Sequence, residues 1–188
     1  MRVGVLALQG DFAAHAKALE RVGAESVEVR SPEQLASCDA LIIPGGESTV
    51  IGKLMVRYGL FDAIQEFDKP VWGTCAGLIL MGKKITQGEE RGGQPTLGLM
   101  DISVARNAFG RQIDSFEADI DSTLGTIHGV FIRAPYIAES GDDVEKLAYY
   151  EGKLILARQG RFLVSAFHPE LTDDTTLLKY FLSFNNPS

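Results

Sequence analysis

One cysteine of this chain has neighbours that suit a nucleophile. Cys75 lies in Gly73-Thr74-Cys75-Ala76-Gly77, after an apolar run and before a second apolar, helix-compatible segment. Glycines on both sides allow a tight strand-to-helix turn. The unpaired N–H groups and the dipole of a helix N-terminus favour a thiolate. The pattern predicts a nucleophile elbow for acyl transfer. The alternative is a buried cysteine that acts as a small apolar side chain, as Cys38 is expected to do.

A nucleophilic thiol needs a base, and the chain has 3 histidines. His168 follows the apolar run 162–167 and begins His168-Pro169-Glu170, at a strand end where ligands bind in α/β sheets. In an extended segment, residues two apart project to the same side, so Glu170 can orient the imidazole. The alternative is a turn that merely ends the strand. His15 is expected on the surface of the first helix, and His128 is expected to be structural.

A third motif, Pro44-Gly45-Gly46-Glu47-Ser48, follows another apolar run. Its Gly-Gly segment exposes backbone N–H groups, which can form an oxyanion hole with the N–H of Ala76. The alternative is a plain loop in which Ser48 or Thr49 caps the next helix. No Gly-Lys-Ser/Thr follows, so the motif is not a Walker phosphate loop. The three motifs end three separate predicted strands, and this co-occurrence favours a catalytic interpretation.

Short apolar runs alternate with helical patterns in the first half of the chain. Strands are expected at residues 2–8, 25–29, 40–43 and 70–74, with helices after Asp11, from Pro32, from 48 past 54, and at 60–67. This alternation predicts an α/β fold with a mainly parallel central sheet covered by helices on both faces.

The second half has a different texture. Residues 83–95 are polar and glycine-rich, and we expect an exposed hairpin or loop there. Short strand-like runs follow at 99–104, 126–132, 144–150, 154–159 and 162–167, and a closing helix is expected at 175–184. These runs predict antiparallel additions that return the 162–167 strand to the main sheet.

Composition narrows the class of protein. The length of 188 residues fits one domain over 1–188, and 45% hydrophobic with 23% charged residues is typical of globular chains. The net charge of −7 argues against nucleic-acid binding. No run approaches the roughly 20 apolar residues of a membrane span. The first eight residues are interrupted too early for a signal peptide. Two cysteines make no disulfide framework, so a cytoplasmic location is expected.

With these motifs in place, the chain resembles the class I (triad) glutamine amidotransferases. More narrowly, it is similar to the glutaminase subunits of pyridoxal 5′-phosphate synthases, in stretches at residues 4–10, 44–49, 106–112, 131–135 and 167–170. The resemblance spans essentially the whole chain and implies a three-layer, flavodoxin-like fold. The length suits a stand-alone glutaminase subunit.

The resemblance implies hydrolysis of L-glutamine to glutamate and ammonia through a glutamyl thioester. Cys75 is then the nucleophile, His168 the general base and acid, and Glu170 the group that orients it. It implies further contacts to glutamine and the oxyanion from Gly46, Glu47, Ser48, Ala76, Arg106, Ile132 and Arg133. A guanidinium suits the α-carboxylate of glutamine. The alternative for Arg106 and Arg133 is a surface salt bridge, and Arg133 can act through its backbone alone.

The resemblance also implies a partner, a synthase subunit that consumes the ammonia to make pyridoxal 5′-phosphate. No cofactor and no metal are expected in this chain. We expect the Gly45-Gly46 peptide to reorient on docking, because two adjacent glycines allow it. Competing interpretations are a glutaminase subunit serving another synthase, a cysteine peptidase or other hydrolase, and a catalytically silent regulatory subunit.

Overall fold

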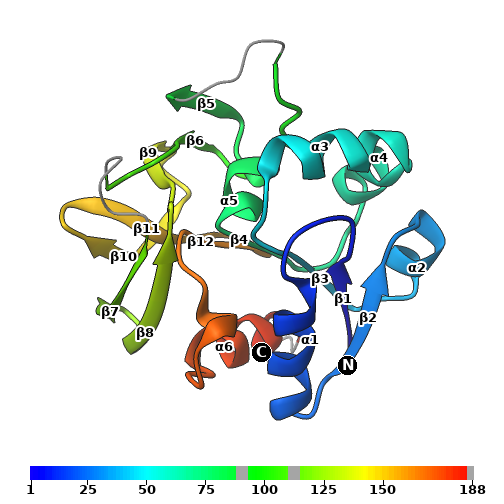
Figure 1. Cartoon of the computed structure of the whole chain (residues 1–188), viewed down its shortest axis with the longest axis horizontal. Coiled ribbons are helices and arrows are strands. Elements are labelled where there is room, and N and C mark those ends of the chain that lie inside the picture. The colour runs from blue at the N-terminus through cyan, green and yellow to red at the C-terminus, as the bar shows by residue number, and fades with distance from the viewer. Residues whose placement is uncertain (88–92, 110–114, 186–188) are drawn as a thin grey trace.

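The structure, a computed structural model, describes residues 1–87, 93–109 and 115–185. Within these residues the strands form a single 12-stranded sheet. Its central order is β2-β1-β3-β4-β12-β11-β10-β7-β8, and β5, β6 and β9 pair beside this path. Figure 1 shows α3, α4 and α5 on one face of the sheet and α1 and α6 on the other. The α/β class with helices on both faces is therefore confirmed.

The first half of the chain forms the parallel part of this sheet. Its strands are β1 (Arg2–Leu6), β2 (Glu25–Val29), β3 (Ala40–Ile43) and β4 (Val71–Thr74). Every residue of β3 and β4 is buried, as expected of strands covered on both faces. The helices are α1 (Phe12–Arg21), α2 (Pro32–Ala36), α3 (Ser48–Arg57), α4 (Leu60–Gln65) and α5 (Ala76–Met81).

Local capping explains where two of these helices begin. The Asp11 carboxylate accepts a hydrogen bond from the Ala14 N–H at 3.2 Å, as predicted. Ser31 and Gln34 form a capping box at the start of α2. The N-cap of α3 is Glu47, which makes no side-chain capping bond. Ser48 and Thr49 therefore lie inside the helix, with their hydroxyls available for other contacts.

The second half forms the antiparallel part, in which β5 pairs in parallel with β6 and the other pairings among the strands named next are antiparallel. Its strands are β5 (Lys84–Gln87), β6 (Ile102–Ala105), β7 (Ser115–Ser122), β8 (Gly125–Ile132), β9 (Tyr136–Ser140), β10 (Glu145–Tyr150) and β11 (Lys153–Gln159). The prediction missed β7 and β9, and it left open a hairpin or a loop where β5 forms. β7 alternates exposed and half-buried residues, with only Ile120 fully buried, so it lacks an apolar run. Residues 88–92 of the predicted loop, and 110–112 of the stretch 106–112, lie outside the described residues.

One late strand joins the two parts. β12 (Phe162–Ser165) pairs in parallel with β4 and antiparallel with β11, which confirms the predicted return of this strand. After it come a 3₁₀ turn (Pro169–Leu171), α6 (Thr176–Leu182) and a second 3₁₀ turn (Ser183–Asn185). The chain that leaves β12 therefore emerges beside the end of β4, where Cys75 lies.

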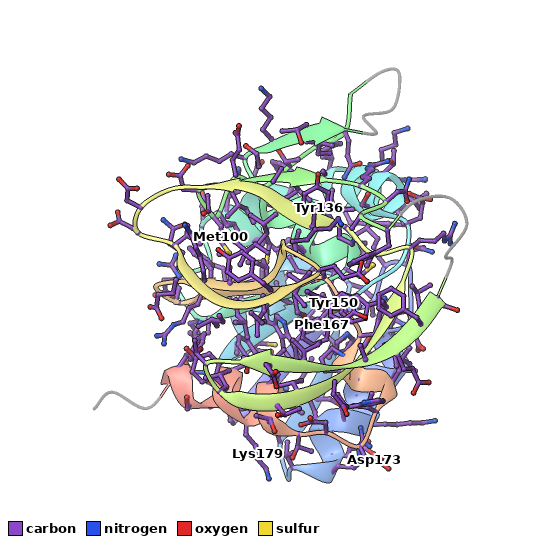
Figure 2. The ribbon with its side chains drawn as sticks, turned by 90° about the vertical axis from the view of Figure 1, so that its left-hand side faces the viewer. Met100, Tyr136, Tyr150, Phe167, Asp173 and Lys179 are labelled. Carbon is purple, nitrogen blue, oxygen red and sulfur yellow. The ribbon has the colours of Figure 1, made fainter. Side chains whose placement is uncertain are left out.

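An aromatic cluster stiffens the antiparallel part. Phe131 is 1% exposed and stacks on Phe116, with ring centroids 4.6 Å apart. It also contacts Tyr150 at 5.4 Å and Phe167 at 5.6 Å. Tyr150 and Phe167, which both contact Phe131, are labelled in Figure 2. The cluster therefore holds the end of β8 against the segment that precedes His168.

Candidate functional site

Cys75 occupies a strained turn between β4 and α5. Its φ of 50° and ψ of −101° lie where a residue with a side chain is rarely found. Its N–H donates a hydrogen bond to the Ser165 carbonyl of β12 at 2.8 Å, which ties the turn to the sheet. Such strain persists only when the surroundings enforce it, and it collects at functional sites. The turn has the geometry of the predicted nucleophile elbow.

Gly77, two residues after Cys75, must be a glycine because the backbone of β3 lies very close to it. A Cβ on Gly77 would collide with the backbone carbonyl oxygen of Ile43 in β3. Because a backbone atom cannot move aside as a flexible side chain does, α5 can pack this closely on the sheet only with glycine here. The close packing brings the N-terminus of α5, including the Ala76 N–H, to the end of β4.

His168 and Glu170 form a buried pair at the end of the β12 segment. The His168 Nδ1 atom lies 2.7 Å from Glu170 Oε1, and the His168 N–H donates to the Val130 carbonyl of β8 at 2.7 Å. The prediction that Glu170 faces the imidazole is confirmed, but its reason was wrong. Pro169–Leu171 is a 3₁₀ turn rather than an extended segment. The turn folds the glutamate back beneath the ring.

The electrostatic environment of this pair has clear directions. Burial alone would lower the pKa of His168, but the hydrogen bonds and charges of Cys75 and Glu170 outweigh it and raise the pKa to about 10. Burial alone would raise the pKa of Glu170, yet its interactions with His15 and His168 hold that pKa below the ordinary value. At neutral pH the site therefore holds an imidazolium between the Glu170 carboxylate and Cys75.

The Gly45-Gly46 loop lies across from the cysteine. A Cβ on Gly45 would contact the imidazole of His168 and the Cβ of Cys75, so the loop passes directly over both. Gly46 has a φ of 147°, a conformation that side chains disfavour. The next N–H, from Glu47, donates to Gln9 Oε1 at 2.8 Å. The loop after β1 thus supports the predicted oxyanion loop, a contact that no motif in the sequence predicted.

Arg106 reaches the start of α3 from the antiparallel part. Its Nη2 donates to the hydroxyls of Ser48 at 3.1 Å and Thr49 at 3.3 Å. Both hydroxyls also donate to Gln94 Oε1 at 3.2 Å. Neither Thr49 nor Gln94 was predicted as a site residue. The network presents the guanidinium of Arg106 beside the predicted glutamine-binding residue Ser48.

The end of β8 forms the opposite wall. The Cys75 thiol lies 3.8 Å from the Ile132 carbonyl oxygen, a weak hydrogen bond. Arg133 has a φ of 41°, and Asn107 one of 54°. Both lie at left-handed turns where the strands end. Ile132 and Arg133 are solvent-exposed, so Arg133 is not held in a buried ion pair.

These features enclose one cavity of about 500 Å³, a size typical of small-molecule sites. Every site residue predicted from the sequence lines it: Gly46, Glu47, Ser48, Cys75, Ala76, Arg106, Ile132, Arg133, His168 and Glu170. Gln9, Asn107 and Leu171 line it as well and were not predicted. Their signal was positional, since each lies within four residues of a predicted strand end.

The other two histidines and Cys38 do not line the cavity. Cys38 is buried and donates to the Gln34 carbonyl, as expected of an inert cysteine. His128 is on the exposed face of β8, between Asp119 at 2.7 Å and Glu117 at 3.1 Å. His15 was predicted on the surface, and this was wrong, because it is 2% exposed. The spacing Phe12, His15, Ala16 and Leu19 is an apolar-face pattern that could have revealed its burial.

The described residues contain neither a cluster of metal ligands nor a helix that could span a membrane. In residues 1–87, 93–109 and 115–185, no three or more His, Cys, Asp or Glu side chains are arranged to hold a metal ion. Across those ranges, every helix is too short or too polar to cross a membrane.

An α/β sheet that gathers an elbow cysteine, an imidazole and a buried carboxylate around one cavity defines a class, the thiol-dependent acyl-transfer enzymes. Residues 5–185 match the SNO glutamine amidotransferase family. The chain belongs to this family, which confirms the resemblance drawn from its motifs.

Individual relatives agree with that assignment. The protein of Pelotomaculum thermopropionicum called pyridoxal 5′-phosphate synthase subunit PdxT is 57% identical, over 97% of this chain and 94% of that protein. The protein of the same name from Geobacillus kaustophilus is 52% identical, again over 97% and 94%. A crystal structure of a glutamine amidotransferase matches with a TM-score of 0.92 and 50% identity, over 98% of this chain and 99% of that one.

Proposed function

We propose that this protein is the glutaminase subunit of a pyridoxal 5′-phosphate synthase. It hydrolyses L-glutamine to L-glutamate and ammonia, and it acts through Cys75, His168 and Glu170. The observation that carries the proposal is the buried His168–Glu170 pair, joined at 2.7 Å, that faces an elbow cysteine across one cavity. Close relatives carry the name of that synthase subunit.

The first half of the reaction forms a thioester. The Cys75 thiolate attacks the side-chain amide carbon of glutamine, and the amide oxygen becomes an oxyanion. The N–H groups of Gly46 and Ala76 stabilise that charge. The His168 imidazolium then gives its proton to the amide nitrogen, the carbon–nitrogen bond breaks, and ammonia leaves. The imidazole that remains is neutral and still hydrogen-bonded to Glu170.

The second half releases glutamate. Neutral His168 takes a proton from a water molecule as the water oxygen attacks the thioester carbon. The carbon–sulfur bond breaks, and the imidazolium and the thiolate are restored. The sum is glutamine plus water giving glutamate plus ammonia, so no cofactor is consumed. Glu170 stabilises the imidazolium in both halves and keeps the ring in one orientation.

Substrate binding uses the polar wall of the cavity. Arg106 binds the α-carboxylate of glutamine, because a guanidinium matches a carboxylate in two parallel hydrogen bonds. Its contacts with the Ser48 and Thr49 hydroxyls orient it toward the cavity. Glu47 and Ser48 at the start of α3, and Ile132 and Arg133 at the end of β8, complete the glutamine site.

The ammonia passes to a synthase subunit that builds pyridoxal 5′-phosphate. Docking of that partner reorients the Gly45-Gly46 peptide and completes the oxyanion hole. In the structure the Gly45 oxygen lies so close to Gly10 that a Cβ there would collide with it. A structure of the complex with an unchanged Gly45-Gly46 peptide would sink this part of the proposal. Both cysteines are free, in keeping with a cytoplasmic location.

The test measures glutamate release by this chain, alone and with the purified synthase subunit. We expect glutamate release to rise strongly when the partner is present. Cys75→Ala should lower that release by at least about 1,000-fold. The complex of Cys75→Ala should still make pyridoxal 5′-phosphate from added ammonia. No glutamate release in either case would leave a silent regulatory subunit. Stimulation by a different synthase instead would identify another amidotransferase.

A further inference from the structure

One buried titratable side chain takes no part in the proposed reaction. His15 lies on α1, which packs against β1, β2 and the Pro169–Leu171 turn, and its side chain is 2% exposed. Burying an imidazole is costly unless its nitrogens find partners. Its Nε2 atom lies 3.4 Å from the Glu170 carboxylate, so it contacts a residue of the proposed triad.

The contacts of His15 join two parts of the site. Its Nε2 atom lies 3.1 Å from Thr74 Oγ1 and 3.4 Å from Glu170 Oε1. Thr74 directly precedes the nucleophile and is fully buried. The edge of the ring meets Trp72 of β4, with centroids 6.1 Å apart and planes at 81°, so the ring is held in one orientation.

The charge state of His15 follows from its surroundings. Burial lowers the pKa of the imidazole, against the opposing charge of Glu170, and His168 lowers it further. Asp11, at the start of α1, acts in the same direction as Glu170. At neutral pH the ring is therefore neutral and carries one hydrogen. A carboxylate only accepts hydrogen bonds, so the tautomer that suits this site has its hydrogen on Nε2.

Few hydrogen bonds hold the carboxylate of Glu170 in place. Its Oε1 atom is hydrogen-bonded to His168 at 2.7 Å, and the Nε2 atom of His15 lies 3.4 Å from the same oxygen. Its buried Oε2 atom has no hydrogen-bond partner among the described residues. A carboxylate held at one oxygen by one imidazole can still rotate about its terminal torsion. A second donor restricts that rotation.

We propose that His15 is a positioning residue of the glutaminase site, which shares its Nε2 hydrogen between Glu170 Oε1 and Thr74 Oγ1. It thereby fixes the carboxylate that orients His168 and links it to the residue before Cys75. This inference rests on the proposed glutaminase function. His15 touches neither substrate nor nucleophile, so its effect falls on kcat rather than on glutamine affinity.

Three variants separate this role from simple packing. His15→Leu keeps an apolar body against Trp72 but has no donor. His15→Gln places an amide nitrogen near the position of Nε2. His15→Asn carries the same amide one methylene shorter, near the position of Nδ1, and is the matched control. Each is assayed for glutamate release in the complex with the synthase subunit, and its folding is checked by circular dichroism and thermal unfolding.

We expect His15→Leu to lower kcat about 10- to 100-fold, with KM for glutamine changed less than about 2-fold. His15→Gln should recover kcat to within about 3-fold of wild type, whereas His15→Asn should not. If His15→Leu fails to fold, the comparison of kcat between His15→Gln and His15→Asn still tests the proposal. Equal kcat in those two variants would overturn the proposal, as would a wild-type kcat in His15→Leu.

A double-mutant cycle tests the route through Glu170. If His15 acts by holding the carboxylate, His15→Leu has little further effect on kcat in a Glu170→Ala background. Multiplicative losses in the double variant would overturn the proposal. A wild-type complex that releases no glutamate would instead reject the proposed function, and the inference with it. An active wild type with unaffected His15 variants rejects the inference alone.

Discussion

The parallel and antiparallel parts of the sheet supply different kinds of group to one cavity. The parallel part supplies mainly backbone: the strained Cys75 turn, the Gly45-Gly46 loop and the N-terminus of α5. The antiparallel part supplies side chains and walls, namely Arg106 after β6 and Ile132 at the end of β8. His168 lies where they meet, after β12 and hydrogen-bonded to Val130 of β8.

The two parts differ in how clearly their site residues can be recognised in the sequence. A backbone feature needs particular residues at fixed offsets, such as glycines beside a turn, so its signature is local. A side chain that reaches across from another strand needs only the right register, which many sequences can provide. Breaking each part in turn should therefore have distinguishable effects.

The largest effect is expected at the place where the two parts meet. His168→Gln should lower glutamate release in the complex about 100- to 10,000-fold, because proton transfer is lost. His128→Gln is the matched control, since that histidine is likewise paired with carboxylates but lies on the exposed face of β8. Its activity should stay near wild type. Similar losses in both variants would mean that the assay reports stability rather than catalysis.

The antiparallel part should unfold most readily when its aromatic cluster is opened. Phe131→Ala removes a ring that is 1% exposed, and we expect the free energy of unfolding to fall by about 3–5 kcal/mol. Urea denaturation measures this. Tyr58→Ala, at a side chain that is 50% exposed on the parallel side, should cost less than about 0.5 kcal/mol. A small effect at Phe131 would show that the cluster does not stabilise the end of β8.

The protonation of His168 should set the pH dependence of kcat/KM for glutamine. Because the pKa of His168 is raised to about 10, the imidazolium persists at pH values well above 6.5, the ordinary pKa of a histidine. The alkaline limb of kcat/KM should then lie near pH 10. Glu170→Gln removes the neighbouring negative charge, so the limb should move to lower pH, each unit being about 1.4 kcal/mol. A limb that stays in place would contradict the role assigned to Glu170.

The same shift has a consequence for stability. A raised pKa in the folded state stabilises it fully below pH 6.5, and this contribution is lost as the pH rises toward about 10. The free energy of unfolding should therefore fall more over that interval in wild type than in His168→Gln. Parallel curves for the two proteins would be the contrary result.

The smallest effect is expected at the polar wall. Arg106→Lys keeps the charge but loses the paired geometry, and we expect KM for glutamine to rise about 10-fold with kcat little changed. Arg30→Lys is the control, because Arg30 pairs with Glu28 on the surface at 2.6 Å. It should leave both constants unchanged. A loss in kcat alone for Arg106→Lys would indicate a role other than binding.

Much of the fold and site was predictable from the sequence. The alternation of buried runs and capped helices predicted β1 to β4 and their helices within a few residues. The polar strand β7 and the strand β9 were missed, because their stability comes from pairing with neighbours rather than from an apolar run. Every predicted site residue lines the cavity, since most are backbone-defined or lie at predicted strand ends.

The elbow at Cys75, the Gly45-Gly46 loop and the family could be inferred from the sequence alone, because each rests on residue types at fixed short spacing. The way in which His168 and Glu170 face one another, through a 3₁₀ turn rather than a strand, is visible only in the folded chain. The same is true of the burial of His15 against Glu170. Contacts between residues 155 positions apart depend on how α1 packs over the sheet, and no local pattern carries that information.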